Sequence, residues 1–397
     1  MPWKESLKMD QKREFVMQSL NHPNFRQLCR EYGISAKTGY KWRERFLASG
    51  LDGLEEQSRR PLHPARELPE QVVCEIVRIQ QAHPSWGPRK IRILYQRKHR
   101  GQSPSESSFK RVLDRAGFVL HRRLRPHGLT GRLAKGRVAS APNQVWTVDF
   151  KGWWKDRNGL RVEPLTVRDE YSRMILEVRA VENSSTDTVK AAFERLFRLY
   201  GLPEAIRSDN GAPFAATNAL LGLSRLSAWW LALGIDLERG RPGRPQDNGA
   251  HERMHKDIRR ELESGRLGRD QQAFDLWREE FNTVRPHETL GMKVPADIYR
   301  PSDRQYKGTP DDIDYGNMST RRVKRSTGSI SYQDQDIMLT TALGGWSVGL
   351  AHLSSGLVEV WFASLLLGHI DPKTSGFRGA PWGPPEAHQN HPKTCNP

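Results

Sequence analysis

The chain has little cysteine and no signal-peptide-like apolar stretch, and both shortages limit what it can be. Its three cysteines, Cys29, Cys74 and Cys395, are widely spaced and form no C-x-x-C pair. That spacing argues against a disulfide framework and against a cysteine zinc site. The first residues carry none of the apolar stretch that a signal peptide needs. We therefore expect a cytoplasmic protein.

One long stretch, residues 337–358, contains no Asp, Glu, Lys or Arg. A membrane helix needs about 20 predominantly apolar residues. Glycine and serine pairs break this stretch, and the pattern favours short strands over a membrane span. The sequence therefore predicts no membrane partner.

Positive charge is concentrated in the first third of the sequence. The 397 residues include 63 Lys and Arg against 46 Asp and Glu, a formal net charge of +17. Residues 1–140 hold 29 Lys and Arg against 13 Asp and Glu, a net of +16, whereas residues 141–397 have a net of only +1. This asymmetry predicts a nucleic-acid-binding arm joined to a nearly neutral body. The alternative is a basic segment that binds anions without specificity.

Residues 1–60 have the pattern of a small helical DNA-binding domain. A short helix near Phe25, a turn at Gly33, an N-cap at Ser35 and a second helix follow in the order of a helix-turn-helix. The alternative is a helical hairpin with a solvated basic face. The predicted core residues are Leu28, Ile34, Trp42 and Phe46, and the predicted DNA contacts are Lys37, Thr38, Lys41 and Arg45.

Residues 64–118 repeat this helical design without obvious sequence repetition. An amphipathic helix comes first, and Pro88 suits the first turn of a second helix. A serine can cap a third helix, on which we expect Lys110 and Arg111 to contact DNA. The sequence therefore predicts a second helix-turn-helix-like domain.

The rest of the chain divides by composition and periodicity. Residues 119–142, which include Arg137, form a basic linker that can follow phosphates, although an inert tether fits nearly as well. Residues 143–305 predict three successive strands and then alternating helices and strands, which indicates a three-layer α/β core. Residues 318–370 predict a small β-barrel-like domain, and the Pro- and Gly-rich residues 371–397 are expected to be disordered.

Three acidic residues in the middle of the chain form the candidate active site. Asp149 lies inside an apolar strand, Asp209 ends another strand, and Glu252 lies near the start of a helix. Mg²⁺ prefers oxygen ligands, and three rigidly placed carboxylates can hold two ions around one phosphodiester phosphorus. Lys256 and Arg259 lie one and two turns beyond Glu252, which suits contact with a DNA phosphate. The alternative is an ordinary surface pair of Glu252 with Lys256.

A second motif overlaps the third acid. Residues 251–255 read His-Glu-Arg-Met-His, which matches the H-E-x-x-H motif of zinc proteases. A motif this short recurs by chance, and the basic residues that follow suit a nucleic-acid surface better than a buried zinc helix. A metalloprotease is therefore the minor alternative.

In this order along the chain, the motifs resemble those of the integrase-core (DDE) transposases of bacterial insertion sequences, which are related to retroviral integrases. The similarity extends over about residues 1–370. The gap of 42 residues between Asp209 and Glu252 is longer than is common among these proteins. The resemblance rests on the helix-turn-helix, Trp-Thr-Val-Asp at 146–149, Ser-Asp-Asn-Gly at 208–211, Gln-Asp-Asn-Gly at 246–249 with Glu252, and the basic Arg259.

The resemblance implies a multidomain chain: an all-α helix-turn-helix region, an RNase H-like catalytic core and a small β domain. It implies that Asp149, Asp209 and Glu252 are catalytic residues that bind two ions of Mg²⁺ or Mn²⁺, with Lys256 and Arg259 positioning DNA. The partners would be double-stranded element ends and target DNA, and a homo-oligomer would bring two ends together at the bacterial nucleoid. The activity would be cleavage that frees a 3′-OH, followed by strand transfer. A catalytically inactive or nuclease-only DNA-binding relative is the alternative.

Overall fold

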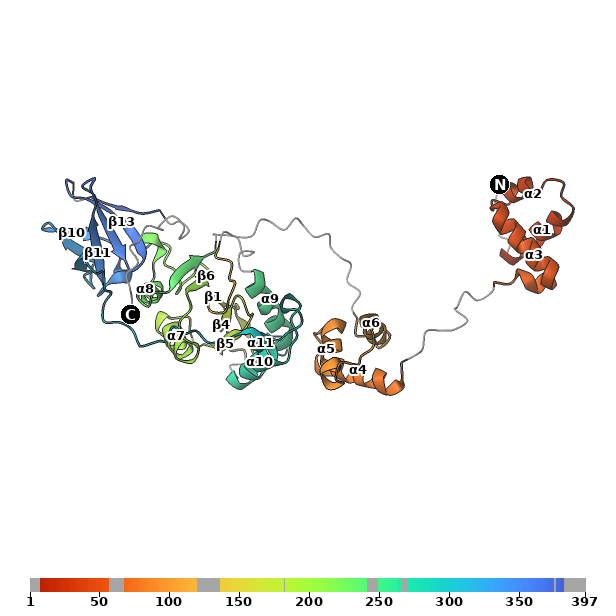
Figure 1. Ribbon diagram of the computed structural model, residues 1–397, viewed down its shortest axis with the longest axis horizontal. Helices are drawn as coiled ribbons and strands as arrows, with labels where there is room; N and C mark the ends of the chain where they lie inside the picture. The colour runs from red at the N-terminus through yellow and green to blue at the C-terminus, as the bar shows by residue number, and fades with distance from the viewer. Residues whose placement is uncertain are drawn as a thin grey trace. The chain divides into compact units, whose positions relative to one another are not determined.

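The chain divides into two compact units, Met1–Glu70 and Gln71–Pro397 (Figure 1). Most of the predicted linker and the end of the predicted tail lie outside the residues that the structure describes. The computed structural model describes residues 8–56, 68–119, 136–181, 183–240, 249–263, 265, 270–374 and 376–381.

The first unit is a bundle of three helices followed by a 3-10 turn. The Ser35 hydroxyl caps the third helix and accepts a hydrogen bond from the Thr38 backbone amide at 3.2 Å, which confirms the predicted cap. Leu28 and Trp42 are buried in one core with Phe15, and the other two predicted core residues are partly buried beside them. The elements are α1 (Lys8–Asn21), α2 (Phe25–Glu31), α3 (Ala36–Ser49) and η1 (Gly50–Leu54).

Three further helices follow, as the sequence predicted. Pro88 is the first residue of the middle helix, where its missing amide hydrogen costs nothing. The Ser105 hydroxyl caps the start of the third helix. Gly117, just after its end, has a φ of +77°, which is the left-handed conformation common at helix C-termini. Ile91 and Phe109 are fully buried. The helices are α4 (Glu70–Ala82), α5 (Pro88–Lys98) and α6 (Glu106–Arg115).

A five-stranded sheet with the order β5-β4-β1-β6-β7 forms the centre of the α/β core. β1 is antiparallel to β4 and β4 is antiparallel to β5, whereas β6 is parallel to β1 and β7 is parallel to β6. An antiparallel meander continued by parallel strands is the expected RNase H-like arrangement. The strands are β1 (Val145–Phe150), β4 (Pro164–Asp169), β5 (Ile175–Ala180), β6 (Ala205–Ser208) and β7 (Asp236–Arg239), with β2 (Trp154–Lys155) and β3 (Arg161–Val162) in a separate ribbon.

Helices on both faces of this sheet complete three layers (Figure 1). Strand alternation sends Trp146 and Val148 to the face covered by α7 and α8, where they share a core with Phe193. Met254 of α9 and Phe274 of α10 belong to the core on the other face. The elements are α7 (Thr186–Tyr200), η2 (Leu220–Gly222), α8 (Arg225–Ala232), α9 (Gly249–Ile258), the π-helical turn η4 (Arg259–Glu263), α10 (Gln271–Thr283), η5 (Glu288–Leu290) and α11 (Pro295–Ile298).

The C-terminal region forms an antiparallel sheet of the order β14-β13-β12-β11-β8, and β9 and β10 form a separate hairpin. β8 and β14 remain the two edges of the sheet, so a closed barrel is not confirmed in the described residues. β14 (Gly376–Gly379) extends the sheet into the segment that was expected to be disordered. Ala228 and Leu231 of α8 belong to the core of this region. The other elements are β8 (Ser319–Arg322), β9 (Ser329–Tyr332), β10 (Gln335–Met338), η6 (Thr341–Leu343), β11 (Ser347–His352), β12 (Val358–Phe362) and β13 (Leu365–Asp371).

The uncharged stretch 337–358 supplies the end of β10, all of η6 and β11, and the first residue of β12. Within the described ranges, no helix is long and apolar enough to cross a membrane.

Candidate active site

The first two acids lie on neighbouring parallel strands. Asp149 is in β1, and Asp209 directly follows β6. The two strands pair with Thr147 opposite Arg207, and continuing that register by two residues places Asp209 opposite Asp149. The exposed Asp209 carboxylate accepts a hydrogen bond from the Gly211 backbone amide at 3.1 Å. The sheet therefore brings the two carboxylates together at one edge.

Glu252, in the first turn of α9, joins this pair electrostatically. Burial, followed by the negative charges of Asp209 and Glu252, raises the pKa of Asp149 to about 7, against a hydrogen bond with the Phe150 backbone that lowers it. A carboxyl group responds in this way only when the other acids are close to it. The negative charges of Asp209 and Glu252 therefore both act on Asp149, while the ligand atoms that lie within 4.8 Å of one another belong to Asp149 and two histidines.

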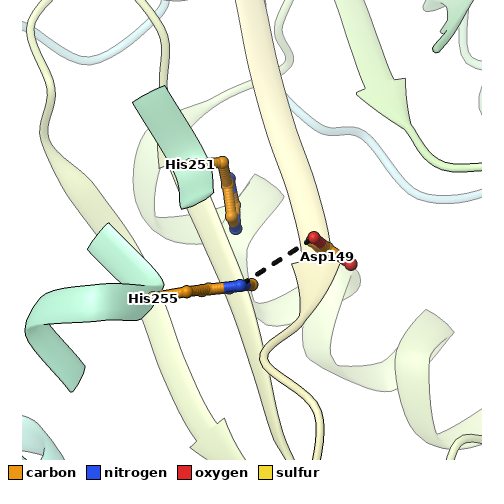
Figure 2. Close-up of side chains that lie close together, drawn as sticks. All are labelled: Asp149, His251 and His255. Atoms are coloured by element: carbon orange, nitrogen blue, oxygen red, sulfur yellow. Dashed lines mark ion pairs between the residues drawn. The ribbon is translucent and has the colours of Figure 1, made fainter. Parts of the chain in front are cut away.

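Two histidines of α9 lie next to Asp149 (Figure 2). The Nε2 atoms of both rings contact the Thr166 hydroxyl, at 2.7 Å for His251 and 2.9 Å for His255. The Nδ1 atom of His251 contacts the Thr147 hydroxyl at 2.8 Å. The Nδ1 atom of His255 lies 3.9 Å from Oδ2 of Asp149. Each ring is therefore fixed by a threonine of the sheet.

Both rings are uncharged at neutral pH. Burial, followed by the positive charges of Lys151 and Arg168, lowers the pKa of His255 to about 3. Burial, the neighbouring His255 ring and Arg168 lower the pKa of His251 well below its usual value. The contact of His255 with Asp149 is also too long for a hydrogen bond. It joins a neutral ring to a carboxyl group.

This geometry disfavours the zinc-protease alternative. In an H-E-x-x-H site, one nitrogen of each histidine binds the same zinc ion. Here both Nε2 atoms converge on the Thr166 hydroxyl, and His251 has a hydrogen-bonding partner at each ring nitrogen. Sequence reasoning noticed the histidines through this motif but missed their link to Asp149, because Thr147 and Thr166 carried no signal.

The donor atoms at this edge fit a divalent cation. Asp149, His251 and His255 have possible ligand atoms within 4.8 Å of one another, and of the two rings only His255 has a nitrogen without a hydrogen-bond partner among the described residues. The charges of Asp209 and Glu252 act on the same place. Negative charge of this density favours a cation, and carboxylate oxygens are the ligands that Mg²⁺ and Mn²⁺ prefer.

The basic residues predicted beyond Glu252 lie at the end of α9. Lys256 is exposed in its last turn, and Arg259 begins the π-helical turn η4. The Arg259 side chain is 76% exposed, and its Nε lies 3.9 Å from Glu263. Glu263 also pairs with Lys151, just after β1, at 2.6 Å. The two predicted DNA contacts are therefore open to solvent on the segment that carries Glu252.

The predicted DNA contacts of the first unit lie on α3. Lys37 and Lys41 are exposed, whereas the Thr38 hydroxyl interacts with the cap residue of the helix at 2.9 Å. Lys41 and Arg45 lie over the Trp42 ring, 4.7 Å and 5.3 Å from its centroid. Cation–π contacts thus order two of the four side chains.

In the second helical region, the predicted DNA contacts Lys110 and Arg111 are exposed on α6. Arg137 behaves differently from a linker residue that follows phosphates. Its guanidinium pairs with Glu204 at 3.0 Å and with Asp236 at 2.8 Å. Arg137 therefore links the segment before β1 to Glu204, which precedes β6, and to Asp236 of β7.

Family models match both halves of this architecture. Models described as "Integrase core domain" match residues 139–245, which contain Asp149 and Asp209, and residues 233–295, which contain Glu252. Models described as "Helix-turn-helix domain" and "Homeodomain-like domain" match residues 11–61 and 38–113. The fold and the acid-lined edge define an integrase-core protein with a helix-turn-helix region.

Related proteins come from mobile elements. The chain is 26% identical over 300 residues to the "Insertion element IS476 uncharacterized 39.2 kDa protein" of Xanthomonas euvesicatoria, covering 74% of this chain and 78% of the relative. It is 26% identical over 235 residues to the "Insertion element IS407 uncharacterized 31.7 kDa protein" of Burkholderia multivorans, covering 58% and 80%. The chain is therefore similar to the integrase-core transposases of bacterial insertion sequences, which are related to retroviral integrases.

Solved structures also match this chain. One is a simian T-cell lymphotropic virus intasome in complex with PP2A regulatory subunit B56 gamma, at 16% identity and a TM-score of 0.37. That match covers 70% of this chain and 98% of the matched chain.

Proposed function

We propose that the protein binds the terminal repeats of its element and catalyses metal-dependent 3′-end cleavage and strand transfer into target DNA. The observation that supports this proposal is that Asp149 in β1 and Asp209 after β6 lie on neighbouring parallel strands, and that the charges of Asp209 and Glu252 both act on Asp149. These three side chains are the proposed catalytic residues and metal ligands.

The proposed chemistry is phosphodiester cleavage followed by transesterification. Two ions of Mg²⁺ or Mn²⁺ would supply activation of the attacking oxygen and stabilisation of the leaving oxygen. The chain contributes rigid placement: Asp149 is fixed within β1, Asp209 by its place at the end of β6, and Glu252 by α9. With a cation bound, Asp149 is ionised, because the cation reverses the effect of the neighbouring acids on its pKa.

The helical regions are the proposed DNA-binding parts. Their basic excess supports this assignment, since residues 1–140 have a net charge of +16. The proposed contacts are Lys37, Thr38, Lys41 and Arg45 on α3, Lys110 and Arg111 on α6, and Lys256 and Arg259 near the active site. Joining two element ends to one target requires that two active sites act together, so we propose a homo-oligomer on DNA.

The first experiment is strand transfer by the full-length protein. A labelled duplex of the element's own terminal repeat is incubated with supercoiled plasmid and Mn²⁺, Mg²⁺ or EDTA. Metal-dependent joined product is expected from the unaltered protein. It should be absent in the variants Asp149→Asn, Asp209→Asn and Glu252→Gln.

The matched control is Glu279→Gln, because Glu279 is exposed on α10, outside the proposed site. This variant should join ends normally. Full activity in any triad variant would refute the assignment of that residue. Cleavage without joining would identify a nuclease, and binding without either reaction would identify an inactive relative.

A further inference from the structure

The Thr166 hydroxyl has three polar neighbours but only one hydrogen to donate. Its oxygen lies 2.8 Å from the Asp149 carbonyl oxygen, 2.7 Å from Nε2 of His251 and 2.9 Å from Nε2 of His255. A carbonyl oxygen can only accept a hydrogen bond, so the Thr166 hydroxyl donates its hydrogen to the Asp149 carbonyl oxygen. Both rings must then donate an Nε2–H to the two lone pairs of the hydroxyl oxygen. This assignment satisfies all three contacts.

The assignment determines what the other nitrogen of each ring can do. A neutral imidazole carries one hydrogen, so Nδ1 is an acceptor in both rings. The Thr147 hydroxyl lies 2.8 Å from Nδ1 of His251 and 3.4 Å from the Arg168 carbonyl oxygen, so the shorter contact takes the hydrogen and Nδ1 of His251 accepts it. Nδ1 of His255 has no hydrogen-bond donor among the described residues, and its lone pair lies 3.9 Å from a carboxylate oxygen of Asp149. Two electron-pair donors thus face each other at the candidate metal site.

We propose that Nδ1 of His255 is a metal ligand that, together with Asp149, gives one ion of the site a mixed nitrogen and oxygen coordination. The inference deepens the proposed function and rests on its metal site. Two ligand atoms that each lie about 2.1 Å from one ion are at most about 4.2 Å apart. The observed separation of 3.9 Å meets this condition.

The surroundings of His255 are those of a fixed ligand. Metal-binding histidines usually donate their second ring N–H to an oxygen atom that sets the tautomer and the ring orientation. The Thr166 hydroxyl provides that oxygen, and Thr166 is paired directly opposite Asp149 in the sheet. The side chains of His255 and Asp149 are 13% and 29% exposed, so solvent reaches the space beside them.

A nitrogen ligand changes the metal preference of the site. Carboxylates alone suit Mg²⁺ and Mn²⁺, whereas imidazole favours transition metals over Mg²⁺. We therefore expect the protein to bind Mn²⁺ more tightly than Mg²⁺, by a margin that depends on His255. His251 does not contribute, because both of its ring nitrogens are already occupied.

The test is pulsed electron paramagnetic resonance of Mn²⁺ bound to the full-length protein without DNA. Modulation from a directly bound ¹⁴N nucleus is expected in the unaltered protein. His255→Gln is the informative variant, since its amide nitrogen can keep the hydrogen bond to Thr166 while the Nδ1 ligand is lost. This variant should lose the ¹⁴N signal and bind Mn²⁺ at least about tenfold more weakly, the lower end of what loss of an outer-shell partner costs.

Two further variants make the outcome specific. His255→Asn places an amide oxygen near the Nδ1 position, so it should bind both ions but lose much of the Mn²⁺ preference. Arg253→Gln, at an exposed position of the same helix, should keep the ¹⁴N signal and the affinity. Circular dichroism spectra matching those of the unaltered protein establish that each variant is folded.

The inference is overturned if saturating Mn²⁺ gives no ¹⁴N modulation in the unaltered protein, or if the folded His255→Gln variant retains it. A protonated His255 that only pairs with Asp149 would give the first of these results. Failure of the proposed function is a separate outcome. In that case the ¹⁴N signal and its loss in His255→Gln stand, while no strand transfer occurs with any metal.

Discussion

Replacing Thr166 with valine should reveal how strongly the histidine pair depends on one hydroxyl group. The substitution keeps the side-chain shape but removes the acceptor of two ring N–H groups and the donor to the Asp149 carbonyl. A buried donor without a partner costs about 1–3 kcal/mol. The full penalty applies to His251, which is completely buried. The penalty at His255 is smaller, because its ring is partly exposed and water can accept its N–H. We expect a total loss of about 2–4 kcal/mol.

The control is Thr166→Ser, which keeps the hydroxyl group and loses only a methyl group. Its expected cost is about 1 kcal/mol, as for other single-methyl deletions in a core. Urea unfolding of both variants in EDTA, followed by circular dichroism, measures the difference. Because EDTA removes divalent ions, the comparison is independent of any metal.

A spectroscopic measurement accompanies the stability comparison. In the unaltered protein, ¹⁵N chemical shifts of the imidazole nitrogens should report the Nε2–H tautomer for both His251 and His255. The assignment is wrong if the valine variant is no less stable than the serine variant, or if His255 carries its hydrogen on Nδ1. Either result would also remove the basis for His255 as a metal ligand.

Three further predictions address charge and backbone. In EDTA, the pKa of about 7 at Asp149 lies above its unfolded value, so the stability contributed by its protonated form is lost as pH rises through 7. Asp149→Asn should therefore stabilise the metal-free protein above pH 7, by at most about 4 kcal/mol, and not below pH 4, as thermal unfolding across pH would measure. Hydrogen bonds from Lys98 and a neighbouring histidine hold the pKa of Glu75 below its usual value, so its stabilisation is present at neutral pH and lost on acidification. Glu75→Gln should cost about 0.5–1 kcal/mol in urea unfolding at pH 7, and nothing below about pH 4; equal losses at both values would contradict this. Gly328→Ala should lower the melting temperature and reduce the free energy of unfolding by more than about 1 kcal/mol, because φ is +73° and the new Cβ would lie 2.4 Å from the Thr340 carbonyl carbon. The control, Gly356→Ala, should reduce stability less, since its φ is +84° but no atom lies within 4 Å of the new Cβ.

The periodicity of apolar residues along the sequence indicates the helices and strands whose own residues define a buried face. An amphipathic face defines the helix over Thr186–Tyr200, and a compact apolar run defines the strand over Val358–Phe362. β14 was not predicted, since Gly376–Gly379 offers a single apolar side chain and is held in the sheet by backbone pairing with β13. The alternation of apolar and polar residues also could not predict whether the C-terminal sheet closes into a barrel, because alternation does not specify which edge strands pair.

The candidate site shows the same division between local and long-range information. Asp149 and Asp209 could be recognised because each stands at a fixed place in a strand motif. The position of His255 beside Asp149 depends on the packing of α9 against β1 and β4, and no local pattern encodes it. Arg137 was grouped with the linker for a related reason: its acidic partners, Glu204 and Asp236, lie far along the chain.

Helix α8 has a consequence for truncated copies of this protein. Leu226 and Trp230 belong to the core of the catalytic sheet, while Ala228 and Leu231 of the same helix belong to the core of the C-terminal sheet. A chain that ended before β8 would expose this second apolar side to water, and such a patch promotes aggregation. The long insertion between Asp209 and Glu252 therefore makes the solubility of the α/β core depend on the C-terminal sheet.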